Sequence, residues 1–358
     1  MDATDGADLV LLGLGSVARH FWRTLNDERH RLPCAARVIG VATAHHGCAL
    51  APDGLDPATA NTPAGPASLT TRHDRTSGPP PASALDLLER LARLRTAGHD
   101  GRRLIVIENT PLGLDGGQPG VDHVRAAIDV GADVITANKG PAAFAYRELR
   151  DRASAAGVAF RFEGAVLDGL PLFSLIRETL PTVAIRGVRG VLNTTTNHVL
   201  SAMAVGRSLD DAVRDMQDAG IAEKDPSSDI DGWDAAAKVA VVANVVLDAD
   251  MTPHDVEREG LRAVDPATVR AAHARGGAVK LVAAAHRRYG RVRATVGPTS
   301  LQADDPLARL SATAKGLVLD TDRLGPIVIS KTSSHIAHTA YALLADLISI
   351  QRIPRTDT

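Results

Sequence analysis

Residues Gly220 to Lys238 read G-I-A-E-K-D-P-S-S-D-I-D-G-W-D-A-A-A-K. The stretch carries five acidic side chains and runs into the segment A-A-A-K-V-A-V-V-A-N-V-V over 235–246. A segment that is apolar on nearly every side predicts a buried helix. The five acids are Glu223, Asp225, Asp229, Asp231 and Asp234. We therefore expect them in a loop and in the first turn of a core helix.

Lys238 lies on this predicted core helix, four residues after Asp234, so the two side chains share one helix face. A lysine on a buried helix is unfavourable unless its charge is paired or used. An acidic loop beside such a lysine is a setting in which groups with shifted pKa values carry out proton chemistry. The alternative is a purely structural ion pair. We favour a functional site made of Lys238 and three acids, namely Glu223, Asp229 and Asp234.

Asp231 is different, because an acid just before a helix is commonly its N-cap or a first-turn charge that the helix dipole favours. We therefore predict a structural role for Asp231.

The N-terminus carries a second pattern. An apolar strand over 8–12 runs into G-L-G-S-V-A and then into an amphipathic segment. Strand, glycine turn and helix in this order are typical of dinucleotide binding, with glycines that allow the turn and the approach of a pyrophosphate. A plain tight turn is the alternative. The predicted cofactor-binding residues here are Gly13, Gly15, Ser16, Val17 and Ala18.

The next strand, over 37–42, bears on the choice of cofactor. Sites that prefer NAD usually end this strand with an acid that binds the ribose hydroxyls. Here the strand is followed by Thr43, Ala44, His45 and His46, none of which would repel a 2′-phosphate. We therefore lean toward NADP, with NAD left open.

Two further strands are predicted over 104–107 and 133–136, and the apolar run of the first indicates a buried parallel strand. Open α/β sheets bind ligands at the carboxyl ends of their strands. Asn109 and Thr110 follow the first strand and Lys139 follows the second. We predict that all three face the cofactor, although a solvated loop lysine is the alternative for Lys139. Residues 49–82, rich in Pro, Gly, Ala, Ser and Thr, predict a long loop.

Composition excludes several classes of function. The formal net charge is −2 and aromatic residues make up 3% of the 358 residues. Neither value indicates a nucleic-acid partner. No apolar run is long enough for a membrane span, and the acidic N-terminus does not resemble a signal peptide. The two cysteines fit no metal or disulfide pattern, so we expect a reducing, cytoplasmic setting.

The 220–238 stretch resembles the homoserine dehydrogenase signature G-Y-A-E-x-D-P-x-x-D-x-x-G-x-D-x-x-x-K. The turn Ala137-Asn138-Lys139 and the segments 163–171 and 193–198 are also similar to family patterns. The resemblance covers nearly the whole chain and implies a short form without a C-terminal regulatory domain. Ile221, Thr194 and His198 depart from it, where the family has tyrosine, glycine and tyrosine.

The resemblance implies an α/β fold in two parts. Residues 1–160 would form a Rossmann-type dinucleotide-binding domain, completed by a C-terminal helix within 338–358. Residues 161–337 would form an α+β substrate-binding and dimerisation domain with a mixed sheet. The C-terminal strands cannot easily cover both faces of their sheet from one chain, and the family pairs subunits in this region, so we expect a homodimer.

The resemblance also implies NAD(P)-dependent, reversible oxidation of L-homoserine to L-aspartate 4-semialdehyde, a step of threonine and methionine biosynthesis. Lys139 and Lys238 would be catalytic. Substrate-binding residues would be Glu223, Asp229, Asp234, Thr194 and Thr195. A structural monovalent cation, Na⁺ or K⁺, would be held by Glu163, Val166 and Asp168.

Two alternatives remain open. The departures at Thr194, Ile221 and His198 would suit a dehydrogenase of the same scaffold acting on a different amino-acid semialdehyde or hydroxy acid. Ser333-Ser334-His335 stands where the family has a glycine-rich segment, which would suit a non-catalytic dinucleotide-binding sensor. Retention of both lysines and of the acids argues against the sensor.

Overall fold

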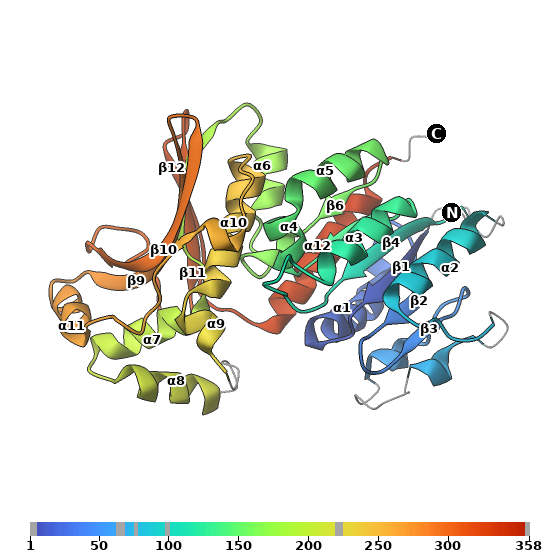
Figure 1. Ribbon diagram of the computed structural model, residues 1–358, viewed down its shortest axis with the longest axis horizontal. Helices are drawn as coiled ribbons and strands as arrows, with labels where there is room; N and C mark the ends of the chain where they lie inside the picture. The colour runs from blue at the N-terminus through green and yellow to red at the C-terminus, as the bar shows by residue number, and fades with distance from the viewer. Residues whose placement is uncertain (1–5, 62–68, 75–77, 97–100, 219–224, 355–358) are drawn as a thin grey trace. The chain divides into compact units, whose positions relative to one another are not determined.

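The computed structural model describes residues 6–61, 69–74, 78–96, 101–218 and 225–354. The chain divides into two compact units. The first contains Met1–Pro141, Arg147–Gly169 and Ile336–Thr358, and the second contains Ala142–Tyr146 and Leu170–His335. Each is described by itself below, with the elements labelled as in Figure 1.

The first unit contains a six-stranded sheet in the order β3-β2-β1-β4-β5-β6. All neighbouring pairs are parallel except the edge pair β2–β3. The strands are β1 Ala7–Leu12, β2 Ala36–Ala42, β3 Cys48–Leu50, β4 Arg103–Glu108, β5 Asp133–Thr136 and β6 Phe160–Arg161.

Helices cover both faces of this sheet, as is usual where helices connect parallel strands. Leu9 and Leu11 pack with α1 (Ser16–Asp27) and α12 (Ile336–Gln351) in one core cluster. On the other face a Cβ at Gly40 of β2 would meet the side chain of Leu87 in α2 (Ala84–Thr96), and α2 contacts α3 (Gly120–Asp129). The C-terminal helix α12 therefore belongs to the first unit, against α1 (Figure 1).

The short strand β3 differs from the expectation of a loop over 49–82. Cys48–Leu50 pairs antiparallel with the end of β2, and all three residues are buried. The backbone N–H of Leu50 also donates to Nδ1 of His73, at 3.1 Å. Three residues are too few to give a periodic pattern, so the sequence did not indicate this strand.

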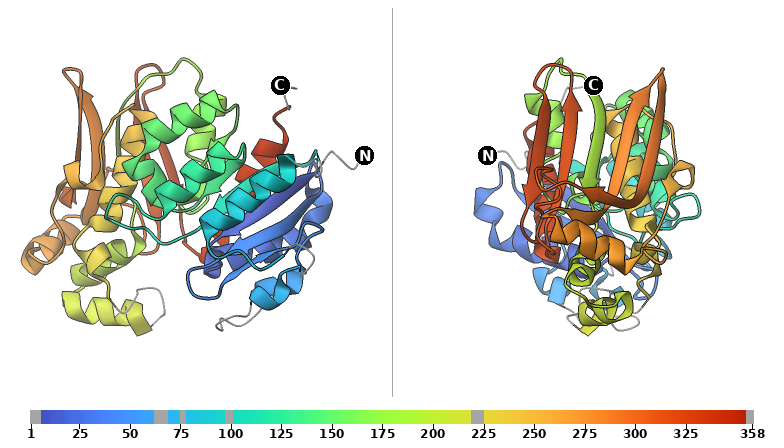
Figure 2. Two further views of the ribbon diagram at one scale, coloured as in Figure 1. Left: turned by 45° about the vertical axis from the view of Figure 1, so that its right-hand side comes forward. Right: turned by 90° about the vertical axis from the view of Figure 1, so that its left-hand side faces the viewer.

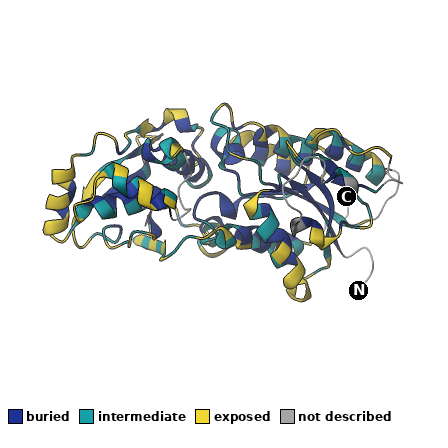
Figure 3. Cartoon of the chain, turned by 90° about the horizontal axis from the view of Figure 1, so that it is seen from below, coloured by how far each residue is buried: buried dark blue, intermediate teal, exposed yellow. Residues whose placement is uncertain are grey.

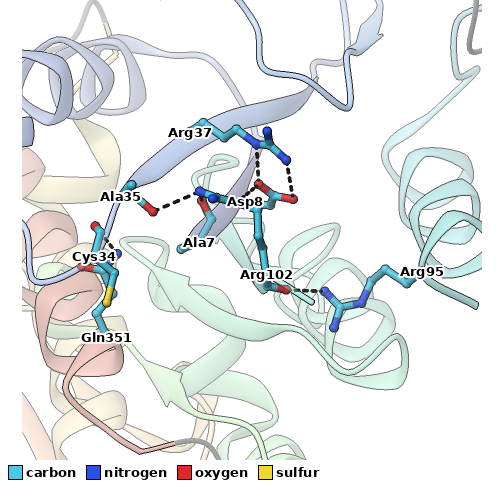
Figure 4. Close-up of polar contacts among 8 residues, drawn as sticks. All are labelled: Ala7, Asp8, Cys34, Ala35, Arg37, Arg95, Arg102 and Gln351. Carbon is cyan, nitrogen blue, oxygen red and sulfur yellow. Dashed lines mark hydrogen bonds and ion pairs between the residues drawn. The ribbon is translucent and has the colours of Figure 1, made fainter. Parts of the chain in front are cut away.

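An ion-pair cluster ties together the amino ends of β1, β2 and β4 (Figure 4). The Asp8 carboxylate accepts from Nε of Arg37 at 2.7 Å and from Nε of Arg102 at 3.0 Å. Arg102 also donates to the carbonyl of Ala35, at 3.1 Å. The cluster lies at the amino ends of the strands, whereas open α/β sheets bind ligands at the carboxyl ends. We therefore assign it a structural role.

The second unit contains another six-stranded sheet, in the order β12-β11-β7-β9-β10-β8 (Figure 2). Its pairs are antiparallel except that β8 runs parallel to β10, so the sheet is mixed, as expected. The strands are β7 Ile185–Val191, β8 Glu257–Arg258, β9 Ala278–Arg288, β10 Arg291–Leu301, β11 Lys315–Thr321 and β12 Pro326–Lys331.

Helices α7 (Thr194–Ala204), α10 (Trp233–Val246) and α11 (Pro266–Ala274) pack against β9, and α8 (Leu209–Asp218) packs against α7. The second unit also contains α6 Phe173–Thr179 and α9 Ser227–Ile230, whereas α5 Tyr146–Ala155 lies largely in the first unit and the residues of α4 Lys139–Phe144 are divided between the two. Figure 3 shows that the strands of the first sheet are largely buried and that the helices carry exposed outer faces. The predicted burial of α10 is confirmed, since every residue from Ala235 to Asn244 is buried.

Candidate active site

The carboxyl ends of three neighbouring parallel strands lie side by side in the first sheet. Leu12 pairs with Glu108, and Glu108 pairs with Thr136, so β1, β4 and β5 all end at the same level. Three loops therefore start side by side. They begin at Gly13, at Asn109 and at Ala137.

The glycine turn after β1 fits the approach of a dinucleotide phosphate. Gly13 has a φ of +92°, and a Cβ there would lie 2.7 Å from the backbone oxygen of Asn109. At Gly15 an added Cβ would meet nothing within 4 Å, so this point is open. Gly15 is also the N-cap of α1 and offers no capping side chain to the first N–H groups of the helix, at Ser16, Val17 and Ala18. Open N–H groups at a helix N-terminus bind anions.

Asn109 gives a second sign of a ligand at this edge. Its side-chain Oδ1 and Nδ2 are both buried, and neither has a hydrogen-bond partner within the described part of the chain. Buried amides are nearly always paired, so an orphaned one suggests a group that binds there. Thr110 beside it is already engaged, because its N–H and its hydroxyl both bond to the Glu108 carboxyl. Lys139 is half-buried at the first position of α4.

In the second unit, Lys238 has the arrangement expected from the sequence. Its Nζ lies 2.7 Å from Oδ2 of Asp234 and 2.9 Å from the carbonyl oxygen of Leu192. Lys238 is 7% exposed, so its ammonium group is held by these two partners rather than by solvent. The carbonyl comes from the residue that follows β7, which brings the end of that strand to the first turns of α10.

Asn193 joins the acids, a role that was not expected from the sequence. Its Nδ2 donates to Oδ1 of Asp229 at 2.7 Å and to Oδ2 of Asp234 at 2.8 Å. Its Oδ1 accepts from the N–H of Thr196, at 2.9 Å, and so caps α7. One amide therefore holds together the end of β7, α9 and α10. Its position directly between a strand and a helix indicates only the cap of α7 and not the bonds to the acids.

Thr194 and Thr195 occupy the first turn of α7, next to Asn193. The hydroxyl of Thr194 is buried and has no partner among the described residues. Like the amide of Asn109, it is a polar group that could contact a bound molecule. Glu223 and Ile221 lie outside the described residues.

The prediction that Asp231 caps the core helix is wrong. Gly232, with a φ of 80°, is the N-cap of α10, whereas Asp231 is the C-cap of α9. The Asp231 carboxylate pairs instead with Arg262, at 2.6 Å. Asp231 ends the short helix α9, so Gly232 and not Asp231 stands directly before α10. The ion pair with Arg262 is a different contact from the predicted helix cap.

The residues proposed for a cation lie in the first unit. Glu163 is buried in the short 3₁₀ turn Glu163–Ala165, and Val166 is buried directly after it. Asp168 has a left-handed φ of 47°. Among the residues described there is no group of three or more His, Cys, Asp or Glu side chains that could hold a metal. A cation here would therefore depend on backbone carbonyls together with the Glu163 carboxylate.

The chain is similar to known proteins along most of its length. The model of the homoserine dehydrogenase family matches residues 171–348, and that of the homoserine dehydrogenase NAD-binding domain matches residues 13–163. An NAD(+)-dependent homoserine dehydrogenase from Pseudomonas canavaninivorans is 32% identical over 350 residues, covering 96% of both chains. The chain belongs to the homoserine dehydrogenase family.

Solved structures of the homoserine dehydrogenase family share the fold. Homoserine dehydrogenase from Thermoplasma acidophilum superposes with a TM-score of 0.78 at 26% identity, covering 97% of this chain and 100% of that one. A mutant of a hyperthermophilic archaeal homoserine dehydrogenase, in complex with NADPH, gives a TM-score of 0.79 at 24% identity, covering 98% of this chain and 99% of that one. The predicted family and fold class are thus confirmed. No helix in the described residues is long and apolar enough to cross a membrane.

We predict that Asn193→Ala lowers kcat of this homoserine dehydrogenase family member by about 10- to 100-fold, because Asp229 and Asp234 lose the amide that aligns them. Affinity for the nicotinamide nucleotide should stay near normal. Steady-state kinetics and nucleotide titration give both values.

Asn244→Ala is the matched control. Like Asn193, Asn244 has a buried side-chain amide. It lies in α10 and bonds to the backbone of Ala142 and Met251. A similar loss of thermal stability with near-normal turnover is expected. Equal loss of turnover in both variants would show that Asn193 acts through stability alone.

Proposed function

We propose that this protein oxidises L-homoserine reversibly to L-aspartate 4-semialdehyde with a nicotinamide dinucleotide, as a cytoplasmic enzyme of threonine and methionine biosynthesis. The observation that carries the proposal is the buried Lys238, held by Asp234 and by the carbonyl of Leu192. An ammonium group fixed in this way can hydrogen-bond a substrate oxygen and exchange a proton with it. Family membership supports the same reaction.

The dinucleotide, when bound, accepts or supplies the hydride. The residues of the first sheet edge would hold it: the N–H groups after Gly15 would bind its phosphates, and the orphaned amide of Asn109 would bond to its polar groups. We assign Lys139, at the carboxyl end of β5, a second catalytic role from its place in the A-N-K turn.

Lys238 would transfer a proton to and from the reacting oxygen of the substrate. In the direction of reduction its ammonium donates a proton to the oxygen of the aldehyde as the alkoxide forms, and in oxidation the amine takes that proton back. Asp234 keeps the group in place through the 2.7 Å ion pair. Asp229, Thr194 and Thr195 would bind the polar groups of the substrate, together with Glu223.

The choice between NAD and NADP rests on the residues after β2. Thr43 binds the N–H of His46 at 2.9 Å and forms a tight turn, and His45 is exposed at that turn. No acid stands there to oppose a 2′-phosphate. We propose that NADP is accepted and preferred, although the Pseudomonas relative is named NAD(+)-dependent.

A direct assay tests the proposed function. Absorbance of the reduced nicotinamide should rise when the purified protein meets L-homoserine and NADP⁺ or NAD⁺. Lys238→Ala should lower kcat by about 10²- to 10⁴-fold, the usual contribution of a general acid, and leave nucleotide binding nearly unchanged. Retention of more than about a tenth of kcat would remove Lys238 from this role.

The unpartnered hydroxyl of Thr194 favours one alternative, a different amino-acid semialdehyde or hydroxy acid as substrate. The added side chain and the loss of a phenol at Ile221 should make homoserine bind weakly, with a KM above about 1 mM. Thr194→Gly combined with Ile221→Tyr should then raise kcat/KM for homoserine. A decrease of kcat/KM in the double variant, with efficient turnover by the unchanged protein, would refute the alternative. Rescue of an inactive protein would put it first.

We also propose a homodimer formed through the second unit. Leu324 and Val328, in the β11–β12 hairpin, are 58% and 48% exposed, and β12 is an edge strand. Exposed apolar side chains on an edge strand favour pairing with another chain. Light scattering at micromolar concentration should give twice the chain mass of 37.5 kDa. A monomer mass would contradict the proposal.

We also propose a structural Na⁺ or K⁺ at Glu163, Val166 and Asp168. Carboxylate and carbonyl oxygens are the donors that hard cations favour, and the backbone turns sharply after Val166 at Asp168 and Gly169, with φ values of 47° and 80°. Thermal stability should rise in KCl or NaCl relative to choline chloride of equal ionic strength. Identical melting in all three salts would exclude the cation.

A further inference from the structure

Glu108 is a fully buried carboxyl group at the last position of β4, with 0% of its surface exposed. It lies at the carboxyl end of β4, between the ends of β1 and β5, which are at the same level. Neither the sequence patterns nor the proposed reaction assigns it a role. An acid is costly at such a position, where an apolar residue would be buried without penalty.

The two oxygens of Glu108 bond to two different loops. Oε1 accepts from the N–H of Thr110, at 2.8 Å, and from the Thr110 hydroxyl. Oε2 accepts from the hydroxyl of Thr136, at the end of the neighbouring strand β5, at 2.8 Å. The carboxyl group therefore links the loop after β4 to the end of β5.

The second link continues as far as the turn that carries Lys139. The hydroxyl oxygen of Thr136 accepts from the N–H of Asn138, at 2.9 Å. Oδ1 of Asn138 accepts in turn from the N–H of Gly140, at 2.8 Å. Lys139 lies between these two residues, so both of its neighbours are tied to Glu108.

The first link fixes the loop that carries the orphaned amide. Asn109 lies between Glu108 and Thr110, and its own N–H donates to the carbonyl of Leu12 at 2.7 Å. Its carbonyl approaches the glycine turn so closely that Gly13 has no room for a Cβ. A shift of this loop would therefore also move the turn that faces the phosphates.

We propose that Glu108 is a positioning residue, which sets the amide of Asn109 for binding the nicotinamide nucleotide and the turn of Lys139 for its catalytic role. The proposal rests on the proposed function for the identity of the ligand. Burial raises the pKa of the Glu108 carboxyl, while the bonds from Thr110, Thr136 and Asn138 oppose that shift. Whether neutral or charged, the carboxyl group has two oxygens at a fixed separation, so it can bond to both loops at once.

Three variants test the proposal by nucleotide binding, measured from NADPH and NADH fluorescence without any substrate. Glu108→Ala should weaken nucleotide affinity by about tenfold or more, the equivalent of one well-placed hydrogen bond. Glu108→Gln should keep near-normal affinity, because its oxygen can accept from Thr110 and its NH₂ can donate to Thr136. Thr136→Val cuts only the second link, so kcat should fall while nucleotide affinity changes little.

Asp133→Ala is the matched control. Asp133 is also a buried acid in a central strand, but at the amino end of β5, where it pairs with Arg103 and accepts from the N–H of Ala159. It should lower thermal stability and leave nucleotide affinity unchanged. Equal affinity in Glu108→Ala and the unchanged protein, or equal weakening by Asp133→Ala, would overturn the proposal.

The outcomes also separate this proposal from the proposed reaction. If the unchanged protein binds NADPH or NADH but does not oxidise homoserine, the reaction fails and Glu108 is still judged by the affinities. If Glu108→Ala does not fold, Thr136→Val decides: normal kcat in that variant would show that the second link positions nothing.

Discussion

The positive charge of Lys238 on a buried helix is the constraint on which the second unit depends. A lone ammonium group there would be too costly, so it must have nearby oxygen atoms. Asp234, one turn earlier, supplies one, and the carbonyl of Leu192 supplies the other. Satisfying the lysine thus draws the end of β7 against α10. Asn193, the next residue, then reaches both Asp229 and Asp234, and so gathers three elements around one amine.

The first unit depends on a different constraint, the register of its parallel ladder. Because β1, β4 and β5 end at the same level, their following loops share one edge of the sheet. The tight approach of Gly13 to the backbone of Asn109 and the bonds of Glu108 then leave these loops little freedom. In both units a buried polar group connects loops that are distant in the sequence. Removing one partner of such a group is costly, which keeps the arrangement in place.

Much of this was predictable from local patterns. The glycine turn after a strand, the spacing of Asp234 and Lys238, and the apolar segment after them each act within one or two turns of chain, and the structure contains all of them as expected. Local patterns failed where a contact came from elsewhere. Strand β3 depends on pairing with β2 and on His73, and Asp231 turned to Arg262 rather than to the helix that follows it.

The sequence by itself determined the types of groups present and their order: two glycines before a helix, a lysine one turn after an acid, and a family signature across the chain. Only the tertiary structure decided which polar groups meet. Nothing near Asn193 in the chain indicates that its amide bonds to acids 36 and 41 residues away. Nor does the sequence reveal that Glu108 bonds to Thr136, 28 residues later. Side-chain hydrogen bonds act over about 3 Å, so their partners follow from strand register and packing, which no local pattern contains.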